Sequence, residues 1–189
     1  GDLVVAGTSA GAAVQSGRPG MITNGLSTNA LTRGATHADF SMPEGCERAQ
    51  RCPPGVVEDD LTWWNRGGWD LTGPVLVDTH VSERRRELRL ITLMGTMADA
   101  TGTSLEAGIG VDETSALTLR LIDGGLHLEA SGQSGAWWFE PPDSRTAVGG
   151  WRARGHYLAP GATWKWSRGR MQLESGAASA PHARTGGSL

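Results

Sequence analysis

The sequence predicts an α/β fold in which helices cover a mostly parallel sheet, with an antiparallel, β-rich part at the C-terminal end. Two short apolar runs, residues 75–77 and 108–111, have the character of buried strands. Between them, residues 83–98 place apolar side chains three positions apart, which predicts a helix. From Ser115 onward the pattern changes to paired strand-like segments, which indicates the antiparallel part.

The N-terminal segment carries the most informative motif. Residues 2–6 form an apolar run that predicts a buried strand, and the pattern Gly-x-Ser-x-Gly follows it at residues 7–11. A strand, this motif and a short helix over residues 10–16 together are typical of the nucleophile elbow of serine hydrolases, with Ser9 as the nucleophile. Such an elbow normally follows several strands. We therefore expect this chain to be the C-terminal part of a longer catalytic domain whose N-terminal strands are missing.

The rest of the chain divides into three segments. Residues 35–70 are rich in Pro and Gly, which predicts an insertion within a domain spanning residues 1–174. Asp123-Gly124-Gly125 predicts a hairpin between two strand-like segments. Further strand-like segments are expected at residues 136–139, 153–158 and 163–173. Residues 175–189 are rich in Gly, Ala and Ser, which predicts a disordered tail.

Composition excludes several classes of function. The net charge of -3 does not favour nucleic acid as a partner, and no apolar run reaches the length of about 20 residues that a membrane span needs. Cys46 and Cys52 are either free thiols or one local disulfide. A zinc site needs about four ligands, and only His37 is near them in sequence. We expect no metal and no cofactor, and the compartment stays open.

A serine nucleophile needs a base and a group that orients that base. His80 follows the apolar run at residues 75–77, and Asp112 and Glu113 follow the run at residues 108–111. Because α/β sheets place their sites at the carboxyl ends of strands, these residues are the candidates. Either acid could orient the histidine. The order Ser, His, acid differs from the order in α/β-hydrolases.

Three blocks in this order resemble the cyanophycinase-like serine peptidases, relatives of the α-aspartyl dipeptidases. The blocks are Gly-Thr-Ser-Ala-Gly-Ala-Ala-Val at residues 7–14, Asp-Thr-His-Val-Ser at residues 78–82 and Gly-Ile-Gly-Val-Asp-Glu-Thr-Ser-Ala at residues 108–116. The resemblance implies a three-layer fold like that of class I glutamine amidotransferases. It also implies Ser9 as nucleophile, His80 as general base and Glu113 as the residue that orients His80.

The same resemblance implies the substrate and the residues that bind it. Arginines follow the family's histidine after four, six and nine residues, where this chain has Arg84, Arg86 and Arg89; Asp78 belongs to the same set. The implied substrate is a peptide or a cyanophycin-like polymer, whose repeating unit carries a free carboxylate that arginine can bind bidentately. The backbone N–H of Ala10 is the implied oxyanion donor. A second donor would lie upstream, so we expect this chain alone to be incomplete and inactive.

Three alternatives stay open. The protein could be an α-aspartyl dipeptidase, which cleaves a related bond. It could be a non-catalytic pseudo-peptidase that binds a polymer through its arginines and its tryptophan-rich insertion. It could also be an esterase of the α/β-hydrolase type that uses Asp112 with His127 or His156. A homodimer is compatible with each of these.

Overall fold

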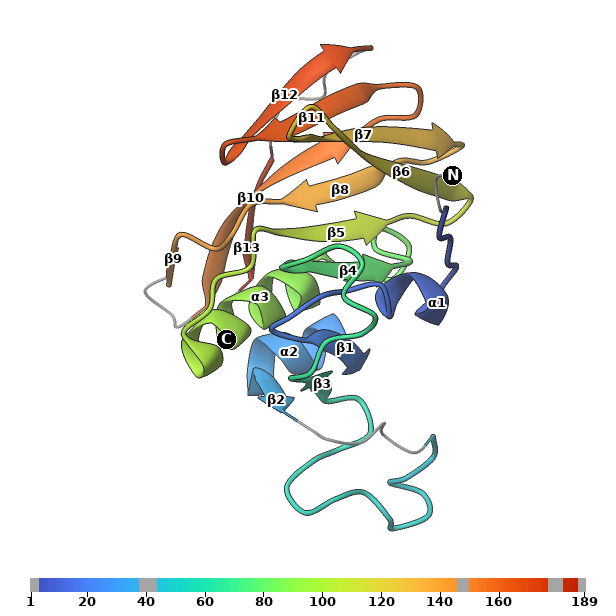
Figure 1. Ribbon diagram of the computed structural model, residues 1–189. Coiled ribbons are helices and arrows are strands. Elements are labelled where there is room, and N and C mark those ends of the chain that lie inside the picture. Colours follow the sequence, from blue (N-terminus) through green and yellow to red (C-terminus); the bar gives the residue numbers. More distant parts are fainter. Residues whose placement is uncertain (1–3, 38–43, 146–149, 177–181, 187–189) are drawn as a thin grey trace.

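The computed structural model describes residues 4–37, 44–145, 150–176 and 182–186 of the chain (Figure 1). Within these residues the chain forms three helices and three small sheets. The helices are α1 (Ala10–Ala13), α2 (Ser27–Arg33) and α3 (Glu87–Thr101). The longest, α3, ends at Gly102, whose φ of 67° is the left-handed conformation that commonly closes a helix.

The central sheet holds the two strands on which the site depends. Its strands, in spatial order, are β13 (His182–Gly186), β10 (Trp151–Leu158), β8 (Ala136–Phe139), β5 (Ala107–Val111) and β4 (Val75–Thr79), and β9 (Ser144–Arg145) pairs with β10. Strands β4 and β5 are parallel, because α3 carries the chain back between them. All other described pairs in this sheet are antiparallel.

The predicted mostly parallel, three-layer sheet is therefore wrong. The chain leaves β5 at Val111 and, after the hairpin of the next sheet, enters β8 at Ala136 directly opposite Val111. A strand that begins where its neighbour ends must run antiparallel to it. The apolar runs predicted where the strands lie, but not the direction in which they pair.

The outer sheet packs over one face of the central sheet and is antiparallel throughout. Its strands, in spatial order, are β12 (Arg170–Ser175), β11 (Thr163–Ser167), β7 (Gly125–Gly132) and β6 (Ser115–Ile122). The hairpin between β6 and β7 turns at Asp123 and Gly124, whose φ values of 49° and 72° suit a tight hairpin turn. This turn lies where the Asp-Gly-Gly signal predicted it.

A third, small sheet lies beneath α3, partly within the predicted insertion. It consists of β1 (Met21–Asn24), β3 (Leu61–Trp64) and β2 (Ala35–His37), with β1 antiparallel and β2 parallel to β3. Leu61 and Trp63 are buried and belong to the same core as α3. The stretch at residues 35–70 therefore contributes two strands to the core, in addition to an exposed loop.

The hydrophobic core occupies both faces of the central sheet, because side chains alternate along each strand. On the face toward the outer sheet, the core includes Val75, Val77, Ile109, Leu128 and Trp164. On the face toward α3, it includes Leu76, Leu90, Ile91, Met94 and Phe139. Figure 1 shows the central sheet lying between α3 and the outer sheet. Strands β4 and β5 are thus packed against α3 on one face and against the outer sheet on the other.

The chain before α1 differs from its prediction. Residues 4–6 form no strand, and Val4 is 86% exposed. Downstream of α1, the backbone N–H of Gly17 donates to the carbonyl oxygen of Val75, and the Ser16 hydroxyl oxygen accepts the N–H of Val77. This segment therefore occupies part of the free edge of β4. Residues 1–3 lie outside the described part of the chain.

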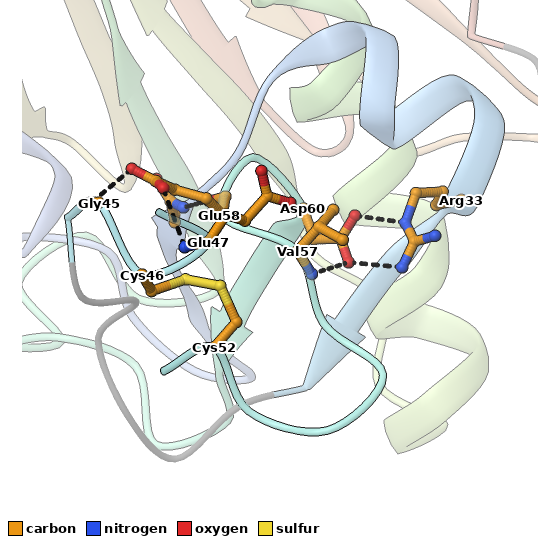
Figure 2. Close-up of a disulfide and its surroundings, with 9 residues drawn as sticks. Arg33, Gly45, Cys46, Glu47, Cys52, Val57, Glu58 and Asp60 are labelled. Carbon is orange, nitrogen blue, oxygen red and sulfur yellow. Dashed lines mark hydrogen bonds and ion pairs between the residues drawn. A yellow bond between two sulfur atoms is a disulfide. The ribbon is translucent and has the colours of Figure 1, made fainter. Parts of the chain in front are cut away.

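The exposed loop of the insertion is held by one covalent and several polar links. Figure 2 shows the disulfide between Cys46 and Cys52, which settles the choice between free thiols and a local disulfide. Beside it, the Glu58 carboxylate accepts the backbone N–H groups of Gly45 and Glu47, at 2.6 and 3.4 Å. The loop projects away from the three sheets (Figure 1).

The C-terminal segment contains one further strand. Where a disordered tail is expected over residues 175–189, residues 182–186 form β13 and pair with β10. Residues 177–181 and 187–189 lie outside the described part of the chain.

Candidate active site

Ser9 occupies a sharp turn immediately before α1. Its φ of 51° and ψ of -124° lie in a region that residues other than glycine rarely adopt. Gly7 is required for this turn, because a Cβ atom there would lie 2.0 Å from the carbonyl oxygen of Gly11. The turn leaves Ser9 exposed to solvent. A strained, exposed serine before a helix has the local geometry of a nucleophile elbow, although no strand precedes it within the described residues.

His80 lies between Ser9 and Glu113. It directly follows β4, and its φ of 57° turns the chain away from the sheet. Its Nε2 atom is 3.5 Å from Ser9 Oγ, and its Nδ1 atom is 2.5 Å from Glu113 Oε1. Because an ionised carboxylate only accepts hydrogen bonds, Nδ1 carries the proton and Nε2 faces the serine hydroxyl as an acceptor. The structure thus brings all three residues together.

The packing between the two strands explains how His80 reaches Glu113. Thr79, the last residue of β4, pairs with Val111, the last residue of β5. Val81, just after His80, packs onto Gly110, where a Cβ atom would lie 2.7 Å from a methyl group of Val81. A glycine at this position therefore lets the loop after β4 lie directly on β5. This brings His80, after β4, next to Glu113, after β5.

The two neighbouring acids have different partners. Asp112 is buried, and its carboxylate accepts the backbone N–H of Ser82 at 2.8 Å and the Ser82 hydroxyl at 2.9 Å. Burial raises the pKa of Asp112, while the bonds from Ser82 oppose that rise. Of the two acids left open by the sequence, it is Glu113 that contacts His80.

The histidines of the esterase alternative pair elsewhere. His127 Nδ1 lies 2.9 Å from a carboxylate oxygen of Glu174, and His156 Nε2 lies 2.8 Å from one of Glu140. Since Asp112 is engaged by Ser82, the combination of residues that this alternative requires is not assembled in the structure.

Two of the four predicted substrate-binding residues form a buried ion pair. Asp78 is 2% exposed and Arg89 is 4% exposed. Arg89 binds both carboxylate oxygens of Asp78, with distances of 2.8 and 2.6 Å, and also donates to the carbonyl oxygen of Gly25. Because both side chains are buried and bind each other, neither presents a free charged group at the surface.

The other two predicted substrate-binding residues lie nearer the surface. Arg84 is exposed. Arg86 is largely buried and donates to the carbonyl oxygen of Thr79 at 2.9 Å. Burial and then the charge of Arg89 lower the pKa of Arg86 to about 10, and its Nε atom has no hydrogen-bond partner among the described residues. Arg86 Nη1 also lies 3.9 Å from Asp78 Oδ1, so the buried carboxylate of Asp78 is shared between Arg89 and Arg86.

The predicted oxyanion donor is the backbone N–H of Ala10. Ala10 is the first residue of α1, so its backbone N–H has no partner within the helix. It is also the residue directly after Ser9, which is the position that supplies this donor in nucleophile elbows.

Three residues around the site were not predicted from the sequence. Ser82 and Glu83 lie in the loop after His80, and Trp137 in β8 donates from Nε1 to the Ser82 hydroxyl oxygen at 3.1 Å. Serine and glutamate in a loop have no pattern that distinguishes them from solvated surface residues. Their partners become visible only once β4, β5 and β8 are paired.

Among the residues that the structure describes, no group of three or more His, Cys, Asp or Glu side chains is arranged to hold a metal ion. None of the described helices combines the length and the apolar character needed to cross a membrane. Comparison of the chain with protein-family models gives no match, and comparison with solved structures gives no significant match.

Proposed function

We propose that this protein is a serine hydrolase that cleaves aspartate-linked peptide or isopeptide bonds. Ser9 is the nucleophile, His80 is the general base and Glu113 orients the imidazole. One observation carries this proposal: the two ring nitrogens of His80 face Ser9 Oγ and Glu113 Oε1. A hydroxyl, an imidazole and a carboxylate from three separate segments thereby form a single hydrogen-bonded line, as in serine hydrolases.

The chemistry follows from this arrangement. Ser9 Oγ attacks the carbonyl carbon, and its proton passes to His80 Nε2. The tetrahedral adduct collapses, the C–N bond breaks, and the leaving amine takes that proton. Water then attacks the acyl-enzyme ester, gives a proton to Nε2, and releases the acid as Ser9 regains its proton. The 3.5 Å separation between Ser9 and His80 is long, but such contacts tighten when substrate binds.

Stabilisation of the oxyanion rests on Ala10 within the described residues. Its free N–H lies at the start of α1, adjacent to the nucleophile. Absence of one oxyanion donor typically lowers turnover by about 100- to 1,000-fold. A site with this single donor is therefore expected to turn over poorly on its own, so the experiments below use the full-length protein.

The substrate class rests on charge near His80. Arg84 is exposed, and Arg86, which is largely buried, adds a second positive charge that shares the Asp78 carboxylate with Arg89. Guanidinium groups bind carboxylates in a bidentate geometry. An aspartate-linked peptide, whether its linkage is α or β, carries a free carboxylate close to the scissile bond. We therefore assign carboxylate recognition to Arg84, with Arg86 supporting it.

Hydrolysis of a small peptide panel tests this assignment. The panel contains a β-aspartyl-arginine dipeptide, an α-aspartyl dipeptide and the same peptides with the free carboxylate amidated. We expect cleavage only of the acidic peptides, none by Ser9→Ala, and a KM raised about 10-fold by Arg84→Gln with kcat preserved. Arg120→Gln, which removes an exposed arginine from β6, is the matched control.

The outcomes separate the parts of the proposal. Equal cleavage of acidic and amidated peptides would contradict carboxylate recognition while leaving the hydrolase intact. Binding of acidic peptides that persists in Ser9→Ala, with no cleavage by the wild-type protein, would favour the non-catalytic polymer-binding protein instead.

A further inference from the structure

The loops that carry His80 and Glu113 are linked by more than the contact between those two side chains. Asp112 belongs to the loop after β5, and its two carboxylate oxygens accept the backbone N–H and the hydroxyl of Ser82, in the loop after β4. One acid beside Glu113 thus holds the backbone two residues beyond His80.

The second link runs in the opposite direction. Glu83 belongs to the loop after β4, and its carboxylate oxygens lie 3.1 and 3.3 Å from the backbone N–H of Glu113. Each loop therefore supplies one carboxylate that accepts a backbone N–H of the other. Because these bonds involve main-chain groups, they fix the path of both loops as well as the direction of individual side chains.

The interacting side chains are too exposed to be fixed by packing alone. The side chain of His80 is 23% exposed and that of Glu113 is 42% exposed. Exposed polar side chains change rotamers readily, and hydrogen bonds between them compete with water. By contrast, Asp112 is 6% exposed, and Trp137 anchors the Ser82 hydroxyl to β8. Asp112 and Trp137 therefore form the buried part of this network.

We infer that Asp112 and Glu83 form a reciprocal clamp that positions His80 against Glu113, an assignment that rests on the serine hydrolase site proposed above. Neither residue touches Ser9 or the reacting atoms; both act on the backbone of the loops. Retaining a buried carboxylate costs desolvation energy, and two bonds from Ser82 compensate Asp112 for that cost. The clamp keeps the Nδ1–H of His80 directed at Glu113, and hence leaves Nε2 free to accept the Ser9 proton.

Four variants test the clamp. Glu83→Ala removes the acceptor for Glu113 N–H, and Glu83→Gln restores a neutral acceptor. Asp112→Asn keeps one carbonyl oxygen but replaces the other with a donor. Asp123→Asn, at the exposed turn between β6 and β7, is the matched control for losing one aspartate charge.

Two measurements are made on each variant of the full chain. The first is the tautomer of the His80 imidazole, read by NMR of isotope-labelled ring nitrogens and assigned through His80→Ala. The second is the rate at which a fluorophosphonate probe labels Ser9. We expect Glu83→Ala and Asp112→Asn to lose part of the Nδ1–H tautomer and to label roughly 10- to 100-fold more slowly, as small displacements of reacting groups do. Glu83→Gln should recover most of both signals.

The results distinguish the clamp from the proposed function. Wild-type tautomer and labelling rate in both Glu83→Ala and Asp112→Asn would overturn the clamp. Glu83 is exposed, so if Asp112→Asn unfolds, wild-type behaviour of Glu83→Ala alone overturns the clamp. If Ser9 is not labelled in any variant but the tautomer shifts in Glu83→Ala and returns in Glu83→Gln, the clamp stands and the hydrolase proposal fails.

Discussion

The carboxylate of Glu113 lies 2.5 Å from Nδ1 of His80, although the two residues are 33 positions apart in the sequence. The contact follows from the pairing of β4 with β5, in which Thr79 lies opposite Val111. Residues that directly follow two parallel neighbouring strands meet at one edge of the sheet. The parallel pair β4–β5 is therefore the part of the fold that creates the candidate site.

Glu113→Gln tests the orienting role of the acid. A glutamine side chain can donate a hydrogen bond to Nδ1 of His80. This favours the tautomer with the proton on Nε2, and a protonated Nε2 cannot accept the Ser9 proton. We expect kcat to fall about 1,000- to 10,000-fold with little change in KM. The measurement is steady-state hydrolysis of an acidic peptide. Glu174→Gln, which removes the carboxylate paired with His127, is the control, and equal rates for both variants would contradict the role.

Arg89→Met tests whether the Asp78–Arg89 pair is structural. Removing Arg89 leaves the buried carboxylate of Asp78 with only the more distant Arg86, at 3.9 Å, and loss of a buried ion-pair partner costs about 3–5 kcal/mol of unfolding free energy. Urea unfolding measures this loss. Arg154→Met is the control, because Arg154 is 65% exposed and lies 3.7 Å from Glu140, and exposed pairs contribute less than about 1 kcal/mol. A loss of substrate affinity without a loss of stability would return Arg89 to the substrate-binding set.

The sequence indicates the candidate site residues more completely than it indicates how the strands pair. His80 and Glu113 follow apolar runs that form β4 and β5 as expected, and Ser9 precedes the expected helix α1, but residues 4–6 form no strand before it. Local patterns do not encode which strand pairs with which, so they do not predict the antiparallel pairing of β8 with β5. The apolar character of Val4 suggests a buried strand, but burial depends on a partner that the local sequence does not specify.

The same limit applies to the surroundings of single residues. Arg84, Arg86 and Arg89 are all positively charged and belong to one spacing pattern. Nevertheless, Arg84 is exposed, whereas Arg89 is buried against Asp78. Their difference arises because α3 begins at Glu87 and directs Arg89 into the interior. The glycines and prolines around Trp63 predict an insertion, whereas β3 places this residue in the core.

The acid dependence of stability tests the role of Asp60 in the insertion (Figure 2). Burial alone would raise the pKa of Asp60, but hydrogen bonds from Arg33, Val57 and Asn29 lower it below its usual 3.8. A carboxyl whose folded pKa is lowered stabilises the protein above the unfolded pKa, and this contribution disappears as pH falls through the folded value. We therefore expect the difference in unfolding free energy between wild type and Asp60→Asn to be largest above about pH 4 and to shrink below it.

Unfolding curves at a series of pH values measure this difference. Asp59→Asn removes a neighbouring exposed carboxylate and controls for the change in net charge. A difference that grows as pH falls would show that the contacts with Arg33 do not stabilise the charged form of Asp60.

Removal of the disulfide tests how independent the insertion loop is. Cys46 and Cys52 are six positions apart, and closing so short a loop contributes about 2 kcal/mol in the chain-entropy account. We expect the Cys46→Ala/Cys52→Ala variant to show faster hydrogen exchange at Gly45 and Glu47, whose N–H groups Glu58 binds. The labelling rate of Ser9 should stay unchanged, because the loop projects away from the sheets (Figure 1). A parallel fall in that rate would show that the loop supports the site.

Covalent labelling of Ser9 tests the central claim most directly. The protein is treated with a fluorophosphonate, and the modified peptide is identified by mass spectrometry. We expect a single phosphonyl adduct on Ser9, formed at least about 100-fold more slowly in His80→Ala and absent in Ser9→Ala. Ser131→Ala, which changes an exposed serine in β7, should label like the wild type. An unlabelled Ser9, or labelling at the same rate without His80, would contradict the account.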